Sequence, residues 1–286
     1  MRGDTAISSE EYWRQVDSLS LRGRIVLLGS QDRGKSTLAT HLVRRLAEDE
    51  TKVAWIDGDI GQSTLGLPTT LNLALAEKGT QETPPPCSTF FVGKEDASEA
   101  QLPLLTGLKR LQERSAELKA ETLVVDTTGF VDKKAGGLVL KEYKLKLLQP
   151  DVILALQGKR ELEPLLAPLR KHPGLWVQTL TPLPGARAKT REHRIQSRRK
   201  KFQKHFHGAR ETTLNIPRLP VYELPRCKRN SLLGLLDEQG YCLSLATAIG
   251  QEGDSLRLYT PLSSPEEVAA VRISPLRLDP LTGLTY

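Results

Sequence analysis

The segment Gly29–Thr37 constrains the fold of this 286-residue chain more than any other. It matches the pattern GxxxxGK[ST], and it stands between a compact apolar run, Arg24–Leu28, and leucines that recur at helical spacing. In such a strand–loop–helix, glycines let backbone N–H groups turn inward around phosphate oxygens. The lysine reaches the outer phosphates, and the serine hydroxyl can bind Mg²⁺. The sequence therefore predicts a phosphate-binding loop, or Walker A motif, made by Gly29, Ser30, Gln31, Asp32, Arg33, Gly34, Lys35, Ser36 and Thr37.

Strand-like and helix-like segments alternate from this loop as far as Leu180. The predicted strands are Arg24–Leu28, Lys52–Ile56, Thr122–Val125, Val152–Leu156 and Leu175–Leu180. The predicted helices between them are Leu38–Leu46, Leu102–Leu118, Leu138–Leu148 and Leu162–Leu169, and Ser8–Glu11 offers a capping box for a lead-in helix. This alternation is typical of an α/β fold with a doubly wound, mainly parallel sheet.

The pattern changes after Thr181–Gly185, where proline and glycine end regular structure. From about residue 216 the chain consists of short apolar runs separated by turn residues, and Asp237–Gly240 resembles a hairpin connection. We expect a main domain over residues 1–215 and a small, mainly β domain over residues 216–286.

Composition excludes several classes of protein. The longest apolar runs are far short of the roughly 20 residues that a membrane span needs. The first residues, Met1–Asp4, carry no apolar core of the kind found in signal peptides. The three cysteines are widely spaced and form no CxxC pair, which argues against a zinc or disulfide framework and favours a cytoplasmic location.

Acidic residues follow two of the predicted strands. Asp57 and Asp59 follow the second strand and lead into Gln62, while Asp126 opens a DxxG-like turn after the strand Thr122–Val125. Ligands of open α/β sheets bind at the carboxyl ends of the strands, so either position can serve a metal ion or accept a proton from an attacking hydroxyl. We favour Asp59 for chemistry and as a partner of Ser36 at the metal. Asp126 is the secondary candidate. The alternative for Asp57 and Asp59 is an Asp-Gly turn whose carboxylates are only solvated.

Positive charge is concentrated between Arg187 and Arg210. This segment holds ten basic residues and one acid, whereas the whole chain has a net charge of +7, so the remaining residues are slightly acidic in sum. On a helix, one face would carry Arg187, Arg191, Arg194, Arg198 and Lys201, beside an apolar stripe of Ile195, Phe202 and Phe206. Repulsion within such a face favours an anionic partner, and arginines on a mobile helix can stabilise a phosphoryl transition state. A solvated charge run is the alternative.

Two further features concern the identity of the nucleotide and the role of the histidines. No asparagine precedes a lysine, so the Asn-Lys-x-Asp motif that recognises guanine is absent, and we expect ATP or loose selection of the base. His193, His205 and His207 have no cysteine or carboxylate companions at ligand spacing, and we expect no metal there.

Taken together, these motifs resemble those of the polynucleotide 5′-hydroxyl kinases related to the kinase subunits of pre-mRNA cleavage and ribosomal RNA processing. The shared features are the GKST loop, the DGDxGQ strand end, the T-x-G turn and the arginine-rich segment. The resemblance covers about residues 22–210, and the tail is similar to that of shorter, prokaryotic-type members. It implies a P-loop kinase domain with a basic lid over about residues 187–210.

The resemblance also implies roles for individual residues. Lys35 and Ser36 would bind ATP and Mg²⁺, Asp59 would activate the 5′-hydroxyl, and Gln62 would help to place metal or phosphate. The substrate end would be held by Thr127, Thr128 and Gly129, with Phe130 where many members have a stacking tryptophan. The lid element RxxxR corresponds to Arg194 and Arg198.

The sequence thus predicts an enzyme that phosphorylates the 5′-hydroxyl of RNA, with DNA as a further substrate, using ATP and Mg²⁺. Two other classes fit parts of the pattern. One is a nucleotide-switched regulatory NTPase, and the other is an ATP-bound RNA-binding scaffold. The kinase hypothesis requires the phosphate loop, Asp59 and the arginines to converge on one triphosphate.

Overall fold

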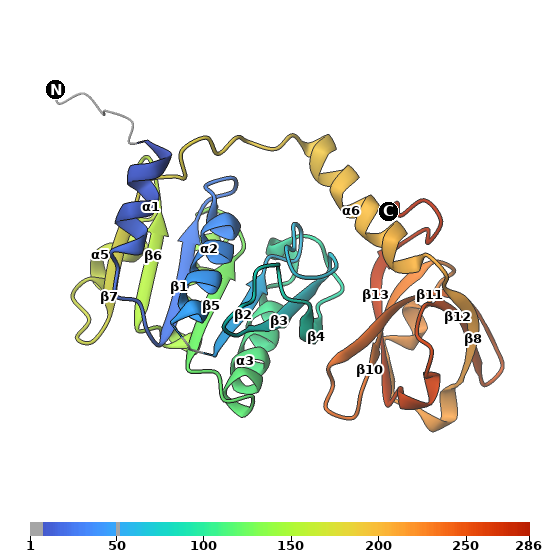
Figure 1. Cartoon of the computed structure of the whole chain (residues 1–286). Coiled ribbons are helices and arrows are strands. Elements are labelled where there is room, and N and C mark those ends of the chain that lie inside the picture. The colour runs from blue at the N-terminus through green and yellow to red at the C-terminus, as the bar shows by residue number, and fades with distance from the viewer. Residues whose placement is uncertain (1–7, 50–51) are drawn as a thin grey trace. The chain divides into compact units, whose positions relative to one another are not determined.

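The computed structural model describes residues 8–49 and 52–286, which form two compact units (Figure 1). The first unit comprises Met1–Gly58, Leu73–Pro85 and Leu108–Lys189, and the second comprises Asp59–Asn72, Pro86–Gly107 and Thr190–Tyr286. The segment Met1–Asp4, on which the signal-peptide argument rests, lies outside the described residues. The chain passes between the units more than once, and the predicted division after residue 215 stays a prediction.

Seven strands form a sheet in the order β4-β3-β2-β5-β1-β6-β7. They are β1 (Arg24–Gly29), β2 (Val53–Gly58), β3 (Thr70–Ala76), β4 (Pro86–Phe91), β5 (Thr122–Thr127), β6 (Val152–Leu156) and β7 (Trp176–Leu180). The pairs β2–β5, β5–β1, β1–β6 and β6–β7 are all parallel. The predicted mainly parallel α/β sheet is therefore confirmed.

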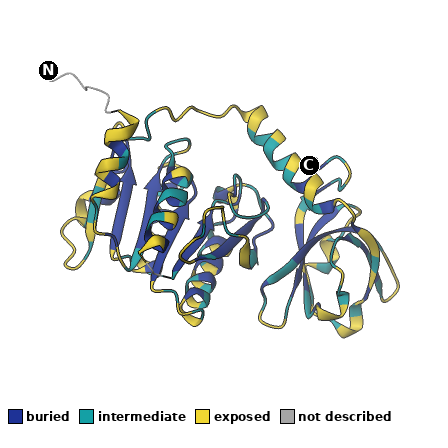
Figure 2. Cartoon of the chain, viewed as in Figure 1, coloured by how far each residue is buried: buried dark blue, intermediate teal, exposed yellow. Residues whose placement is uncertain are grey.

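The central strands are buried because their side chains are apolar on both faces. Ile25–Leu28 and Ile153–Leu156 are fully buried, as Figure 2 shows for the middle of the sheet. Parallel strands that are covered on both sides require such continuous apolar runs. The helices that accompany them are α1 (Ser9–Asp17), α2 (Lys35–Glu48), α3 (Gln101–Glu117), α4 (Gly137–Leu148) and α5 (Glu163–Leu169). Of these, α2 packs against β1, β2 and β5, and α1 begins with the predicted capping box.

Six strands form the second sheet, in the order β8-β12-β11-β10-β13-β9. They are β8 (Arg210–Asn215), β9 (Val221–Tyr222), β10 (Ser231–Leu236), β11 (Cys242–Glu252), β12 (Ser255–Thr260) and β13 (Ala270–Arg277). All neighbours are antiparallel except β9 and β13. Short 3-10 helices occur at Ala97–Glu99, Ile216–Arg218, Leu224–Arg226 and Pro265–Glu267. The expected β-rich C-terminal part is present, and β10 and β11 form the predicted hairpin.

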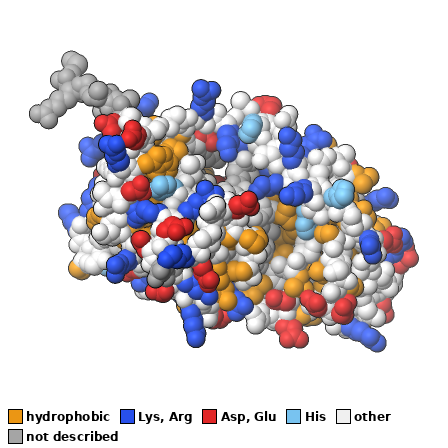
Figure 3. Space-filling view, viewed as in Figure 1, with side chains coloured by type: hydrophobic (Ala, Val, Ile, Leu, Met, Phe, Trp, Pro, Cys, Tyr) orange, Lys and Arg blue, Asp and Glu red, His pale blue; other side chains and the backbone are white. Residues whose placement is uncertain are grey.

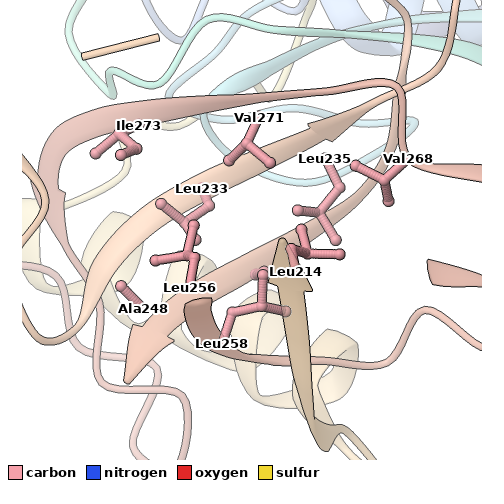
Figure 4. Close-up of a cluster of buried hydrophobic side chains, with 10 residues drawn as sticks. Leu214, Leu233, Leu235, Ala248, Leu256, Leu258, Val268, Val271 and Ile273 are labelled. Carbon is pink, nitrogen blue, oxygen red and sulfur yellow. The ribbon is translucent and has the colours of Figure 1, made fainter. Parts of the chain in front are cut away.

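Each face of this second sheet carries its own apolar cluster because side chains alternate along a strand. One cluster includes Leu233, Leu235, Leu256 and Leu258 (Figure 4). The other includes Leu232, Leu236 and Leu245 and contains Phe202 and Phe206 of helix α6 (Arg191–Phe206). Helix α6 is thus fixed to the sheet through its two phenylalanines.

The start of α6 corrects one expectation about the basic face. Thr190 is the N-cap, and its side chain accepts a hydrogen bond from the backbone N–H of His193 at 3.1 Å. Arg187 therefore precedes the helix and does not share its face. Of the five residues predicted to lie in one row, Arg191, Arg194, Arg198 and Lys201 belong to α6.

Candidate active site

The phosphate-binding loop joins β1 to α2, as the motif requires. Gly34 has a φ of +89° and lies against Leu183, whose Cβ would stand 2.4 Å from a Cβ added to the glycine. Only glycine fits this left-handed, crowded position. Lys35 is buried at the start of α2, and its ammonium donates to the carbonyl of Ser30 at 2.8 Å. The loop that runs from Gly29 to Thr37 has the backbone that phosphate binding needs.

The tip of the loop has contacts with the segments that follow β6 and β7. The Arg33 guanidinium donates to Ser30 Oγ at 2.9 Å and lies 3.4 Å from the carboxylate of Glu161. The Asp32 carboxylate accepts from the backbone N–H of Lys189 at 3.2 Å. These contacts hold the predicted residues Ser30, Asp32 and Arg33 in a defined loop.

Ser36 and Asp126 meet at the carboxyl end of β5. The Ser36 hydroxyl donates to Asp126 Oδ2 at 2.6 Å, and Asp126 is only 1% exposed. Asp57 lies opposite Asp126 in the register of β2 and β5 and is equally buried. Hydroxyl and carboxylate oxygens are ligands that Mg²⁺ accepts. The structure therefore places Asp126, the secondary candidate, beside the predicted metal ligand Ser36.

The turn after β5 lies against the phosphate-binding loop. A Cβ added to Gly129 would stand 2.5–2.7 Å from atoms of Gln31, so only glycine allows this approach. Thr127 Oγ1 donates to the carbonyl of Leu27 at 2.7 Å and thereby ties the turn to β1. The Thr128 hydroxyl is buried and has no hydrogen-bond partner among the described residues. Thr127, Thr128 and Gly129 are thus assembled next to the nucleotide loop, and Phe130, which follows them, is half-buried.

Lys141 supports this turn, and the sequence reasoning did not identify it. Its side chain is fully buried in α4, and its ammonium donates to Thr127 Oγ1 at 3.1 Å and to the Thr128 carbonyl at 2.7 Å. The signal was available, because Lys141 interrupts the apolar stripe of Leu138, Leu145 and Leu148 at helical spacing.

Asp59 and Gln62 lie in the second unit, in the loop that precedes β3. Asp59 Oδ1 accepts hydrogen bonds from the backbone N–H groups of Gly61 and Gln62, both at 3.0 Å. These two bonds orient the carboxylate against the turn that follows it. The Gln62 amide donates to the carbonyl of Gly61 at 2.7 Å and to that of Arg194 at 3.4 Å. The loop therefore touches α6 within this unit.

Lys and Arg side chains line α6 on the face seen in Figure 3. Arg198 pairs with Glu95, with 3.2 Å between Nε and Oε2 and about one-fifth of each side chain exposed. Burial raises the pKa of the Glu95 carboxyl, and the positive charge of Arg198 opposes this rise. Arg194 and Arg198 are thus held close to the loop that carries Asp59 and Gln62.

The predicted residues form two groups, and each group is assembled within one unit. The first unit holds the phosphate loop, Asp126 and the turn Thr127–Phe130, and the second holds Asp59, Gln62, Arg194 and Arg198.

His205, one of the histidines of the basic segment, is partly buried. Burial lowers the pKa of His205, whose ring nitrogen lies 3.2 Å from the carbonyl of Leu245. Within the described ranges, no group of three or more His, Cys, Asp or Glu residues is arranged to hold a metal ion. In the same ranges, no helix combines the length and the apolar character needed to cross a membrane.

The fold and the loop define a P-loop protein of the α/β class. The chain belongs to the family described as mRNA cleavage and polyadenylation factor CLP1 P-loop, whose model matches residues 29–208. The predicted family resemblance is thereby confirmed.

Several archaeal proteins named polyribonucleotide 5′-hydroxyl-kinase are similar to this chain. The protein from Methanocaldococcus jannaschii is 27% identical over an alignment that spans 90% of this chain and 87% of the relative. The protein from Pyrococcus furiosus is 26% identical, spanning 96% and 93% of the two chains. That from Thermococcus kodakarensis is 33% identical over a shorter stretch, 53% of this chain and 42% of the relative.

The fold is also that of a solved structure, the wild-type Clp1p–Pcf11p complex. The match has a TM-score of 0.68 and covers 94% of this chain and 77% of the solved one. At 13% identity, this likeness establishes the shared fold alone.

Proposed function

We propose that this chain is an ATP-dependent polynucleotide 5′-hydroxyl kinase that transfers the γ-phosphoryl group of ATP to the 5′-hydroxyl end of RNA. The observation that carries the proposal is the close approach of Gly129 to Gln31, because it sets a candidate substrate turn directly against the nucleotide loop. The names of the archaeal relatives, which align over most of the chain, support the same activity.

In this proposal the first unit binds the nucleotide. The loop Gly29–Thr37 surrounds the phosphates with backbone N–H groups, and Lys35 neutralises charge on the outer phosphates. Mg²⁺ would be held by Ser36, with Asp126 hydrogen-bonded to that hydroxyl, and would neutralise phosphate charge. A direct role of Asp59 at the metal, also expected from the sequence, stays a prediction.

The acceptor is handled by the turn and by the second unit. Thr127, Thr128, Gly129 and Phe130 hold the terminal nucleotide, and Asp59 accepts the proton of the 5′-hydroxyl as its oxygen bonds to phosphorus. The bond to the β-phosphate oxygen breaks, and ADP leaves. Because phosphoryl transfer has a loose transition state, catalysis depends mainly on positioning and on charges such as those of Arg194 and Arg198.

We further propose a two-domain organisation and a cytoplasmic location for the protein. Residues 1–215 act as the kinase domain with α6 as the basic lid, and residues 216–286 form a small β-rich domain. All three cysteines are free, which suits the reducing cytoplasm. RNA is the proposed partner, and DNA is a second acceptor to be compared with it.

The test incubates a 5′-hydroxyl oligoribonucleotide with labelled ATP and Mg²⁺. Label on the 5′ end is expected, and Lys35→Ala or Arg198→Ala should reduce the rate more than Phe130→Ala does, because charge neutralisation outweighs stacking on one base. Steady phosphate release without an acceptor would instead indicate a switch-type NTPase. Salt-sensitive RNA binding with retained ATP and no turnover would indicate a scaffold.

A further inference from the structure

Lys201 follows the lid arginines on α6, but its ammonium is turned toward the protein. Its Nζ donates to the backbone carbonyl of Ser63 at 2.5 Å and to that of Gly66 at 2.9 Å. The next residue, Phe202, is fully buried in the apolar cluster against the second sheet. An ammonium has three donors, so two of those of Lys201 are used inside the second unit.

The two carbonyls belong to the loop that also carries Asp59 and Gln62. This loop is internally bonded, since Ser63 Oγ accepts from the backbone N–H of Gly66 at 3.0 Å and from the Asn72 amide at 3.3 Å. At its far end Thr69, fully buried, has a φ of +71°, a strained conformation for a β-branched residue. Such strain persists only where surrounding contacts hold the backbone in place.

Lys201 is among the residues through which α6 contacts this loop region. The Gln62 amide reaches the Arg194 carbonyl, and Arg198 pairs with Glu95, whose own carbonyl lies beside Gly61. Among these contacts, that of Lys201 is the one in which a charged side chain of the helix binds the loop backbone twice. It lies close in sequence to both Arg198 and the helix anchor Phe202.

We infer that Lys201 is a positioning residue for the proposed phosphoryl transfer. It fastens the loop of Asp59 and Gln62 to the helix of Arg194 and Arg198, so that the Asp59 carboxylate and the two guanidinium groups keep a fixed spacing. This inference rests on the proposed function. Because its ammonium binds the loop, Lys201 does not belong to the row of cations that we expect to face phosphate.

The experiment compares Lys201→Met with Lys200→Met. Both changes remove one positive charge from adjacent positions of α6, but Lys200 is exposed. Lys201→Met is expected to lower kcat on the order of 10–100-fold, with the KM for ATP nearly unchanged, because small misplacements of reacting groups have effects of this size. Lys200→Met should lower kcat clearly less than Lys201→Met does. Lys201→Arg, which keeps donors for both carbonyls, should recover most of the rate.

Hydrogen exchange of the full-length protein supplies a readout that does not require activity. Lys201→Met should speed exchange at the backbone N–H groups of Gly61, Gln62 and Gly66, while the protection of β10 and β11 stays unchanged. Equal kcat and equal loop exchange in the Lys200→Met and Lys201→Met variants would overturn the inference. If the wild type lacks kinase activity, the proposed function fails, and the exchange experiment still decides whether Lys201 holds the loop.

Discussion

Replacing Phe202 by alanine should weaken the packing of α6 on the second sheet. Phe202 lies in the apolar cluster with no solvent exposure, and it and Phe206 are the buried residues of the helix. Cavity-forming Phe→Ala changes in protein cores cost about 3–5 kcal/mol. The contacts of Phe206 and Lys201 remain, but they offset the loss only in part, because like-charged pairs on the helix repel.

The expected loss in the free energy of unfolding is therefore about 3–5 kcal/mol. For a chain of this size, that corresponds to a fall in melting temperature of roughly 6–20 °C. Urea unfolding followed by circular dichroism measures the first quantity, and differential scanning calorimetry measures the second. Kinase activity should fall even at temperatures where the variant remains folded, because the helix no longer holds Arg194 and Arg198 in place.

Two controls make the result specific. Phe202→Leu keeps most of the buried volume and should cost clearly less than the alanine change. Leu102→Ala removes a hydrophobic side chain that is 77% exposed, and it should change the free energy of unfolding by no more than about 0.5 kcal/mol. If Phe202→Ala cost no more than Leu102→Ala, the packing of α6 on the sheet would be refuted.

Three further predictions concern single side chains. Asp126→Asn should raise the Mg²⁺ concentration for half-maximal activity between about 10- and 100-fold, as changes beside a metal ligand do, and an unchanged Mg²⁺ titration would exclude this carboxylate from the metal site. Burial lowers the pKa of His205 below 6.5, so the unfolded chain binds its proton first as the pH falls, and stability should decrease as the pH drops below about 6.5. Thermal melts at pH 7.5 and 5.5 should show a smaller difference for His205→Gln, and an equal difference would contradict this account. Burial raises the pKa of Cys242 to about 12, whereas Cys87 is exposed, so iodoacetamide at neutral pH should label Cys87 in the native protein and Cys242 only after unfolding, as peptide mapping would reveal.

The parallel part of the first sheet could be predicted because its strands are uniformly apolar. Short apolar runs such as Ile25–Leu28 and Ile153–Leu156 indicate buried parallel strands when helical patterns separate them. Strands β3 and β4 were not predicted, and their sequences explain why. Asn72 is buried in β3 within a hydrogen-bond network with Thr70 and Thr89, and β4 begins at Pro86, the last of three consecutive prolines. Polar pairing inside a sheet has no periodic signature.

The basic segment shows where sequence reasoning reaches its limit. The spacing of its charges predicted a helix, and Phe202 and Phe206 were correctly placed on an apolar stripe. The same spacing put Lys201 among the cations that face phosphate. Its carbonyl partners, Ser63 and Gly66, are more than 130 residues away along the chain, so only the folded structure reveals that its ammonium binds the protein itself.

The two candidate carboxylates are suited to different tasks. Asp126 is almost fully buried and already accepts a hydrogen bond from Ser36, so it can act on a metal ion held by that hydroxyl but cannot approach a bulky acceptor. Asp59 is partly exposed, and two backbone N–H groups orient its carboxylate in a loop that Lys201 holds on α6. A proton acceptor for a polynucleotide end needs access as well as orientation. Because Asp59 combines both, it is the carboxylate to which we assign the 5′-hydroxyl, and Asp126 is the one better placed to serve the metal.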